Sequence, residues 1–292
     1  MGTSVPAPSG APASTGKAGR NLPVAIGMGV GMGLVLCLTL FIEPVAFVVL
    51  ASVAVLYGTV EMTRALRARH LEVPMLPAAA GTLAMLPGAW FGGAVTLGIG
   101  YLLTVLATVG WRLLGPPKER DAPLPVPSIR DVAAGIFVVT YGPLLAGFAV
   151  LMLAQPDGPW RVFVFILLVV ASDVGGFAAG VLFGKHPMAP FVSPKKSWEG
   201  LGGSLTAGAV LGAVSFPLLL DGSWWAGALV GLVAVGVATV GDLSESMIKR
   251  DLGIKDMGTL LPGHGGVMDR LDSLLPAAPV VYLLMLWTLE SA

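Results

Sequence analysis

Long apolar runs recur along almost the whole chain, and short polar segments separate them. A helix needs about 20 mainly apolar residues to cross a hydrocarbon core of roughly 30 Å. Nine segments meet or approach this length: 22–42, 44–61, 74–89, 92–111, 131–153, 161–183, 201–220, 224–241 and 272–289. Helices satisfy their own backbone polar groups in lipid. The pattern therefore predicts an all-α, polytopic integral membrane protein with about nine transmembrane helices, of which the short Pro- and Gly-rich segment 74–89 is the weakest.

The basic residues predict how these spans are oriented. With the N-terminus in the cytoplasm, sixteen of the seventeen Lys and Arg residues fall on the cytoplasmic side, and Arg161 alone falls on the other. Cytoplasmic loops of membrane proteins carry such an excess of positive charge. One span more or fewer would scatter the later charges, so the asymmetry also supports the count. We expect a multi-pass protein of the cell (plasma) membrane.

Composition excludes a soluble globular protein. The 292 residues are 55% hydrophobic and 12% charged, with a mean hydropathy of +0.84, whereas soluble domains carry about 25% charged residues. The net charge is zero, so nothing indicates a nucleic-acid partner, and the lone Cys37 excludes an internal disulfide framework. Residues 1–20 are rich in Ser, Pro, Gly and Ala and are predicted to be a disordered tail. N-terminal transmembrane helices (21–153) and a C-terminal transmembrane region that carries the candidate chemistry (154–292) follow.

Two polar sites interrupt the apolar pattern in the second half. The first is Ser172-Asp173, inside span 161–183. An ionised Asp at membrane depth costs about 2.5–3.5 kcal/mol, so it needs a polar cavity or a partner; a hydrogen bond between two helices is the alternative. The second is the segment SPKKSWEG, from Ser193 to Gly200, whose two lysines we place in a turn set by Pro194. Lysines alone would be ordinary cytoplasmic anchors, but the adjacent Glu and Ser residues favour a turn that organises phosphate or metal.

The third polar site is the segment 249–273, KRDLGIKDMGTLLPGHGGVMDRLDS, with eight charged residues and one His. It follows Asp242 and Glu245 at the cytoplasmic end of span 224–241. Glycines around His264 let the backbone approach a ligand closely. Carboxylates such as Asp242 and Asp269 are ligands that Mg²⁺ prefers, and Lys and Arg neutralise phosphate oxygens. The chemistry fits a polyphosphate, although the chain has no P-loop motif. The glycines of GMGVGMG in the first span are interpreted as helix-packing positions.

The third site also carries a family resemblance. The pattern Ser246-x-Ile248-Lys249-Arg250, then Lys255-Asp256-x-Gly258, then Leu261-Pro262-x-His264-Gly265-Gly266-Val267-x-Asp269-Arg270-Leu271-Asp272 resembles the signature of the phosphatidate cytidylyltransferases. The upstream Ser172-Asp173 and Ser193-Pro194-Lys195-Lys196 match that family in the same order. The resemblance implies a multi-span helical enzyme that forms a homodimer. Such an enzyme joins CTP to phosphatidic acid to give CDP-diacylglycerol and pyrophosphate. It also implies Mg²⁺ held by Asp242 and Asp269, and more weakly K⁺.

The residues and the resemblance together give one candidate set. The expected catalytic residues are Asp173, Lys249, Arg250, Lys255, Asp256, His264 and Arg270; the expected substrate-binding residues are Ser172, Ser193, Lys195, Lys196, Glu199, Ser246, Gly265, Gly266 and Asp272; and the expected metal ligands are Asp242 and Asp269. His264 has two open roles, contact with phosphate or bracing of the turn.

The main alternative is a membrane transporter for an anionic substrate, which an intramembrane Asp and a basic segment would also suit. The single cytoplasmic charge cluster and the lack of paired broken helices count against it. An enzyme that consumes CDP-diacylglycerol is a second alternative, but its clustered Asp motif is absent from the chain.

Overall fold

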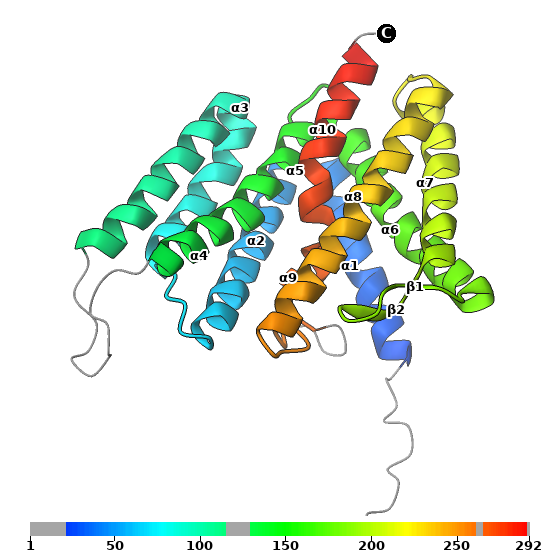
Figure 1. The fold of residues 1–292 in the computed structure, drawn as a ribbon. Helices are drawn as coiled ribbons and strands as arrows, with labels where there is room; N and C mark the ends of the chain where they lie inside the picture. Colours follow the sequence, from blue (N-terminus) through cyan, green and yellow to red (C-terminus); the bar gives the residue numbers. More distant parts are fainter. Residues whose placement is uncertain (1–21, 115–128, 261–264, 291–292) are drawn as a thin grey trace, which may run out of the picture.

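The computed structural model describes residues 22–114, 129–260 and 265–290. The predicted tail 1–20 and His264 lie outside these residues. In chain order the elements are α1 (Leu22–Ile42), α2 (Pro44–Arg67), α3 (Met75–Leu114), α4 (Ile129–Val139), the π-helical turn η1 (Thr140–Leu144), α5 (Leu145–Leu153), α6 (Gly158–Phe183), β1 (Pro187–Ala189), β2 (Ser193–Ser197), α7 (Trp198–Leu219), α8 (Trp224–Asp251), α9 (Met268–Leu271) and α10 (Leu274–Glu290). Figure 1 shows these helices as one bundle.

Within the described residues, seven helical segments are long and apolar enough to cross a membrane. They are α2, α3, the continuous run α4–η1–α5, α6, α7, α8 and the run α9–α10. A shorter apolar stretch, Gly29–Ile42, belongs to α1. The chain is therefore a multi-pass, essentially all-helical membrane protein, as the hydropathy pattern predicts.

Helix α3 folds back on itself. It has 40 residues, which at 1.5 Å per residue is about 60 Å, twice the thickness of a hydrocarbon core. Gly93 breaks it with φ 67°, a conformation that glycine adopts without steric cost. The two arms then pack together, because a Cβ at Gly81 would lie 2.2 Å from Cγ2 of Thr104. Figure 1 shows the two arms side by side. They correspond to the separately predicted spans 74–89 and 92–111.

Helices α6, α7 and α8 approach one another through glycines. A Cβ at Gly175 of α6 would lie 2.8 Å from the carbonyl oxygen of Gly203, and one at Gly212 of α7 would lie 2.0 Å from that of Gly227. Ser204 also donates a hydrogen bond to the carbonyl oxygen of Ser172 at 2.6 Å. Small residues permit this closeness in membrane helices. Gly175, close to Asp173 in the sequence, therefore lets α7 approach α6 closely at this level.

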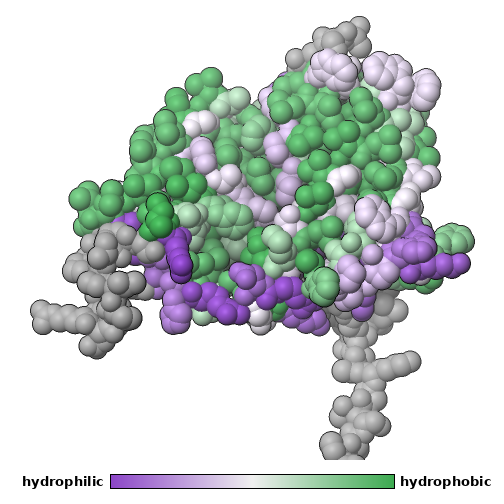
Figure 2. Space-filling model, viewed as in Figure 1, coloured by the Kyte–Doolittle hydropathy of each residue, from purple (hydrophilic) through white to green (hydrophobic). Residues whose placement is uncertain are grey.

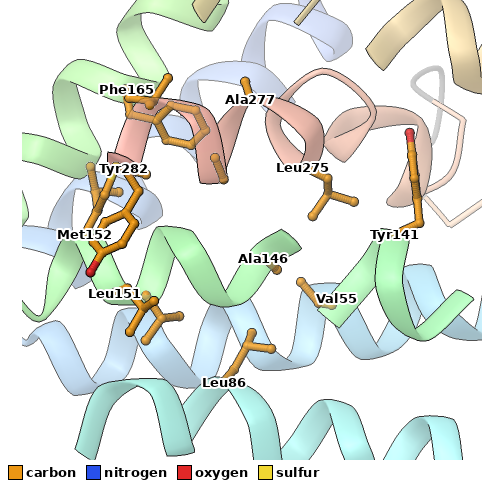
Figure 3. Packing of buried hydrophobic residues seen from close by; sticks show 14 of the residues in the cluster. Val55, Leu86, Tyr141, Ala146, Leu151, Met152, Phe165, Leu275, Ala277 and Tyr282 are labelled. Atoms are coloured by element: carbon orange, nitrogen blue, oxygen red, sulfur yellow. The ribbon is translucent and has the colours of Figure 1, made fainter. Parts of the chain in front are cut away.

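The remaining core joins the two halves of the chain. Val55 of α2, Ala146 of α5 and Leu275 of α10 meet in the cluster of buried apolar side chains drawn in Figure 3. Large hydrophobic side chains also cover much of the outer surface, among them Phe91, Phe177 and Leu218. Figure 2 shows hydrophilic residues gathered along the lower edge, where Figure 1 places α9 and the β1–β2 hairpin. The bundle thus has a wide apolar surface and one strongly polar end.

One local prediction needs correction. The lysines of SPKKSWEG were expected in a turn, but Ser193–Ser197 is a strand paired antiparallel with Pro187–Ala189. Pro194 is compatible with this because an edge strand tolerates a residue without an N–H donor. Helix α8 continues past the predicted membrane span 224–241 to Asp251, so Asp242 and Glu245 lie on the helix itself. Its last turns are polar because they leave the apolar layer at the polar end of the bundle.

Candidate functional site

A polar pocket of about 310 Å³ lies at the polar end of the bundle. Five parts of the chain supply its polar side chains: α6, the β1–β2 hairpin, α7, α8 and the turn between α9 and α10. From the predicted set these are Ser172, Asp173, Ser193, Lys195, Lys196 and Asp242, and Ser273 is added to them. The tertiary structure therefore brings together residues that lie up to 70 positions apart, which the sequence analysis expected.

Charge in this pocket is mixed. The Lys196 ammonium forms an ion pair with a carboxylate oxygen of Asp242, and both side chains are about one quarter exposed. The Ser246 hydroxyl, one turn along α8, donates to the other oxygen of Asp242 at 3.4 Å. Asp173 lies within electrostatic range of Asp242, Asp272 and Lys196. Acidic and basic groups are thus held close together in a hollow of a largely apolar protein.

A second cluster, next to the pocket, is centred on Lys249. Its ammonium nitrogen lies 2.7 Å from an oxygen of Glu245 and 2.9 Å from Oδ1 of Asp269. The Glu245 and Asp269 side chains are 0% and 4% exposed. Two buried carboxylates near one ammonium need that partner, because an unpaired buried charge is strongly destabilising. Lys249 therefore joins α8 to α9 as well as adding positive charge.

Asp269 organises the loop that precedes α9. Its Oδ2 accepts hydrogen bonds from the backbone N–H groups of Met257 at 2.9 Å and Gly266 at 2.8 Å. Gly265 has φ +80°, and a Cβ there would lie 2.9 Å from Oδ2 of Asp269. Glycine is required at this position for both reasons. The predicted close backbone approach exists here, and the group approached in this structure is a carboxylate of the chain itself.

Glu61 of α2 is a site residue that the sequence analysis did not find. Its side chain is buried, its Oε2 accepts a hydrogen bond from the Met268 N–H at 2.9 Å, and Oε1 has no hydrogen-bond partner among the described residues. A Cβ at Gly258 or at Gly266 would lie 1.9 Å or 2.6 Å from its carboxylate. The signal was available, because Glu61 is an acid in an apolar helix like Asp173. It was missed because the predicted span ended at this residue, where an acid is ordinary.

Other predicted residues have different surroundings. Glu199 accepts hydrogen bonds from the backbone of Lys185 and His186 and contacts the His186 ring at 2.6 Å, so in this structure it holds the hairpin. Arg250 donates to the carbonyl oxygen of Val192 at 3.3 Å, which ties α8 to the same hairpin. Lys255 and Asp256 are exposed and do not line the polar pocket.

The carboxylates differ in how well they fit a divalent cation. Among the described residues, no ready-made group of three or more acids, histidines or cysteines surrounds a metal position. Asp242 faces the pocket and has Asp173 and Asp272 as electrostatic neighbours, so oxygen ligands of the kind Mg²⁺ takes are available there. Asp269 has both oxygens engaged by N–H groups and Lys249. Asp269 could hold a metal only by giving up its contact with Lys249, and Asp242 would have to give up only its ion pair with Lys196.

The fold and the site define a class: a multi-pass membrane protein with a pocket at its polar end that is lined by both lysines and carboxylates. Residues 24–288 match the model of the cytidylyltransferase family. The chain belongs to this family, and it is an enzyme of the nucleotidyltransferase class.

Curated relatives agree along most of the chain. The phosphatidate cytidylyltransferase of Mycobacterium leprae is 42% identical over 280 residues, which cover 93% of this chain and 90% of that protein. The phosphatidate cytidylyltransferase of Mycobacterium tuberculosis H37Rv is 42% identical over 93% of this chain and 84% of its own length. That of Pseudomonas aeruginosa is 35% identical over 73% of this chain and 71% of its own.

Proposed function

We propose that this protein is a phosphatidate cytidylyltransferase, which transfers CMP from CTP to phosphatidic acid and releases pyrophosphate. The observation that carries the proposal is the convergence of Asp173, Lys195, Lys196 and Asp242 in one pocket beside the family's signature loop. The relatives bear this activity in their names. CDP-diacylglycerol, the product, is an intermediate of phospholipid biosynthesis.

The proposal includes a topology. The two arms of α3 make two crossings, and α1 adds one to the other six segments, which gives nine. With the N-terminus in the cytoplasm, the polar end of the bundle faces the cytoplasm from the cell membrane. CTP then reaches the pocket from water, while the phosphate of an inner-leaflet lipid reaches it from the bilayer. A homodimer remains an expectation from the family resemblance.

The mechanism follows from the charges in the pocket. An ionised phosphate oxygen of phosphatidate attacks the α-phosphorus of CTP in line, the new P–O bond forms, and pyrophosphate leaves with the electrons of the broken bond. No general base is needed, because the attacking phosphate is already ionised at neutral pH. Lys195 and Lys196 neutralise phosphate oxygens and hold the reacting groups in position. Positioning and charge stabilisation carry most of the catalysis in transfers at phosphorus.

Mg²⁺ is proposed as the cofactor, with K⁺ as a weaker expectation. Asp242 is the carboxylate that fits best, and Asp269 would join it by exchanging its contact with Lys249 for the cation. When bound, Mg²⁺ would supply neutralisation of the phosphate oxygens and of the leaving group.

The activity is tested with purified full-length protein, radiolabelled CTP and phosphatidic acid in detergent. We expect a labelled lipid and pyrophosphate in equal amounts, with no transmembrane gradient present. A protein that forms no labelled lipid, yet moves a labelled organic phosphate across the bilayer of sealed vesicles, would instead be the transporter.

The metal proposal is tested by binding as well as by turnover. Asp242→Asn should fold, lose nearly all CTP turnover and lose most Mn²⁺ binding measured by electron paramagnetic resonance. Asp269→Asn should do the same if it is a ligand. If Asp269→Asn binds Mn²⁺ normally and only unfolds more easily, its carboxylate organises the loop and is not a metal ligand.

A further inference from the structure

A large apolar cavity lies beside the polar pocket. Its volume is about 920 Å³, near the upper end of the usual range for ligand sites. We call it the apolar groove. Its walls come from α1, α2, α5, α6 and the segment from Val267 to Ala278. Figure 3 shows Val55, Ala146, Phe165 and Leu275 of these walls meeting in the interior of the bundle.

The apolar groove and the polar pocket meet at one short stretch of chain. Arg270, Leu271 and Leu274 line the groove, while Ser273 lines the pocket. Arg270 is the one charged residue among the described residues that line the groove. It is also within electrostatic range of Asp173 in the pocket. A molecule in the groove would therefore place an anionic end next to the proposed CTP site.

The glycines of α1 leave the groove wide. Gly29 and Gly33 line it, one turn apart on the same helix, and no heavy atom of the described residues lies within 4 Å of a Cβ built at either one. Within this chain, the interpretation of GMGVGMG as helix-packing glycines is therefore wrong. Here the missing side chains leave open space, whereas Gly212 of α7 and Gly227 of α8 each lie against the backbone of the other helix.

We propose that the apolar groove holds the acyl chains of the lipid substrate, with the lipid phosphate at Arg270. The proposal rests on the proposed function and assigns the path of its lipid substrate. The walls suit hydrocarbon, the one cation suits a phosphate, and that cation, Arg270, lies on the segment that carries the family signature. An acyl chain gains little energy by moving from the bilayer to another apolar surface. The groove therefore serves to align the lipid with the polar pocket, and Arg270 selects the anionic headgroup.

The test uses full-length protein in phosphatidylcholine nanodiscs with phosphatidate that carries a photoreactive diazirine on one acyl chain. Cross-linked residues are identified by mass spectrometry. We expect the cross-links to concentrate on α1, α2 and α10 residues of the groove. The double variant Gly29→Leu/Gly33→Leu places two side chains in the open space that the acyl chain would occupy, and it should lower this yield by about tenfold, which corresponds to about 1.4 kcal/mol of binding.

The matched control is Gly98→Leu/Gly110→Leu on α3, two glycines that also have open space around them but do not line the groove. This control should keep the cross-linking yield of the unmodified protein. A diacylglycerol probe, which lacks the phosphate, should cross-link more weakly to the unmodified protein because it cannot pair with Arg270.

Three results would overturn the proposal. The first is cross-links spread evenly over exposed helices, and the second is an equal cross-linking yield in the two double variants. The third is a groove that forms no cross-links to the lipid because a second copy of the chain or residues 1–21 occupy it. The readout does not depend on turnover. Labelled phosphatidate in the groove without CTP turnover would refute the proposed function alone, and normal turnover with no groove cross-links would refute the groove alone.

Discussion

Lys249 shows how one side chain serves both stability and chemistry. Its ammonium bridges two buried carboxylates, Glu245 and Asp269. We expect Lys249→Met to lower the free energy of unfolding by about 3–5 kcal/mol, because it leaves buried carboxylates unpaired. Unfolding by sodium dodecyl sulfate in mixed micelles measures this.

The additional change Glu245→Gln should recover part of the loss, since it removes one of the two stranded charges. Lys255→Met is the control, because Lys255 is exposed and should change stability little. A Lys249→Met protein as stable as the unmodified one would show that the ion pairs do not hold α8 to α9.

Glu61 is expected to act by positioning the signature loop. Glu61→Ala removes the acceptor of the buried Met268 N–H, which should cost about 1–3 kcal/mol, and should speed hydrogen exchange in residues 257–270. Glu61→Gln keeps an acceptor oxygen and should show a smaller effect. Hydrogen exchange followed by mass spectrometry measures both.

Glu43→Ala, at the N-cap of the same helix, provides the control, since Glu43 makes no side-chain cap hydrogen bond and is exposed. Unchanged exchange in Glu61→Ala, with turnover lost, would contradict a positioning role and point to direct contact with substrate.

Several residues could be predicted from sequence because charge in an apolar layer is costly. Asp173, Lys195, Lys196 and Asp242 share the pocket, as expected. Glu199 and Arg250 were expected to serve the substrate, from their residue types and from the motif, and in this structure both hold the hairpin. A motif identifies which residues matter, but a side chain's partner depends on which atoms the fold places within about 3 Å.

At the scale of elements, the contact between α7 and α8 offers a sharp test. In Gly212→Ala the new Cβ would meet the carbonyl oxygen of Gly227, which is backbone and cannot rotate away. We expect a loss of about 1–3 kcal/mol, as in other overpacked sites, with lower turnover because α8 carries Asp242. Unfolding and CTP turnover measure the two effects.

Gly202→Ala in the same helix is the matched control, because no heavy atom of the described residues lies within 4 Å of its Cβ position. It should be neutral or stabilise the helix by up to about 1 kcal/mol. Equal effects of the two substitutions would mean that α7 and α8 are not in close contact in the membrane.

A helix or strand could be predicted from the sequence where its residues gave a clear hydropathy pattern. The two arms of α3 were expected as separate spans because Pro87, Gly88, Gly92 and Gly93 interrupt the apolar pattern there. The β1–β2 hairpin was not predicted, since its pairing places Pro187 opposite Ser197 across a polar loop without alternating hydrophobic residues.

For the whole molecule, orientation is the property to test. In a Cys37→Ser background, Ser223→Cys lies in the turn before α8 and Thr259→Cys lies in the loop before α9. A membrane-impermeant maleimide added to intact cells should label Ser223→Cys and should label Thr259→Cys only after permeabilisation. The reverse pattern would place the candidate site outside the cytoplasm.

The sequence by itself determined the class of fold, the polar end and most of the charged groups of the pocket. Local hydrophobicity decides which segments enter lipid, and a charged residue in such a segment needs a partner or a polar cavity. Only the tertiary structure decided that Glu61 braces the signature loop from the other half of the chain, that Asp269 is engaged by backbone N–H groups, and that Arg270 borders an apolar groove. These are contacts between segments far apart in the sequence, and their geometry depends on how whole helices pack, which no local pattern encodes.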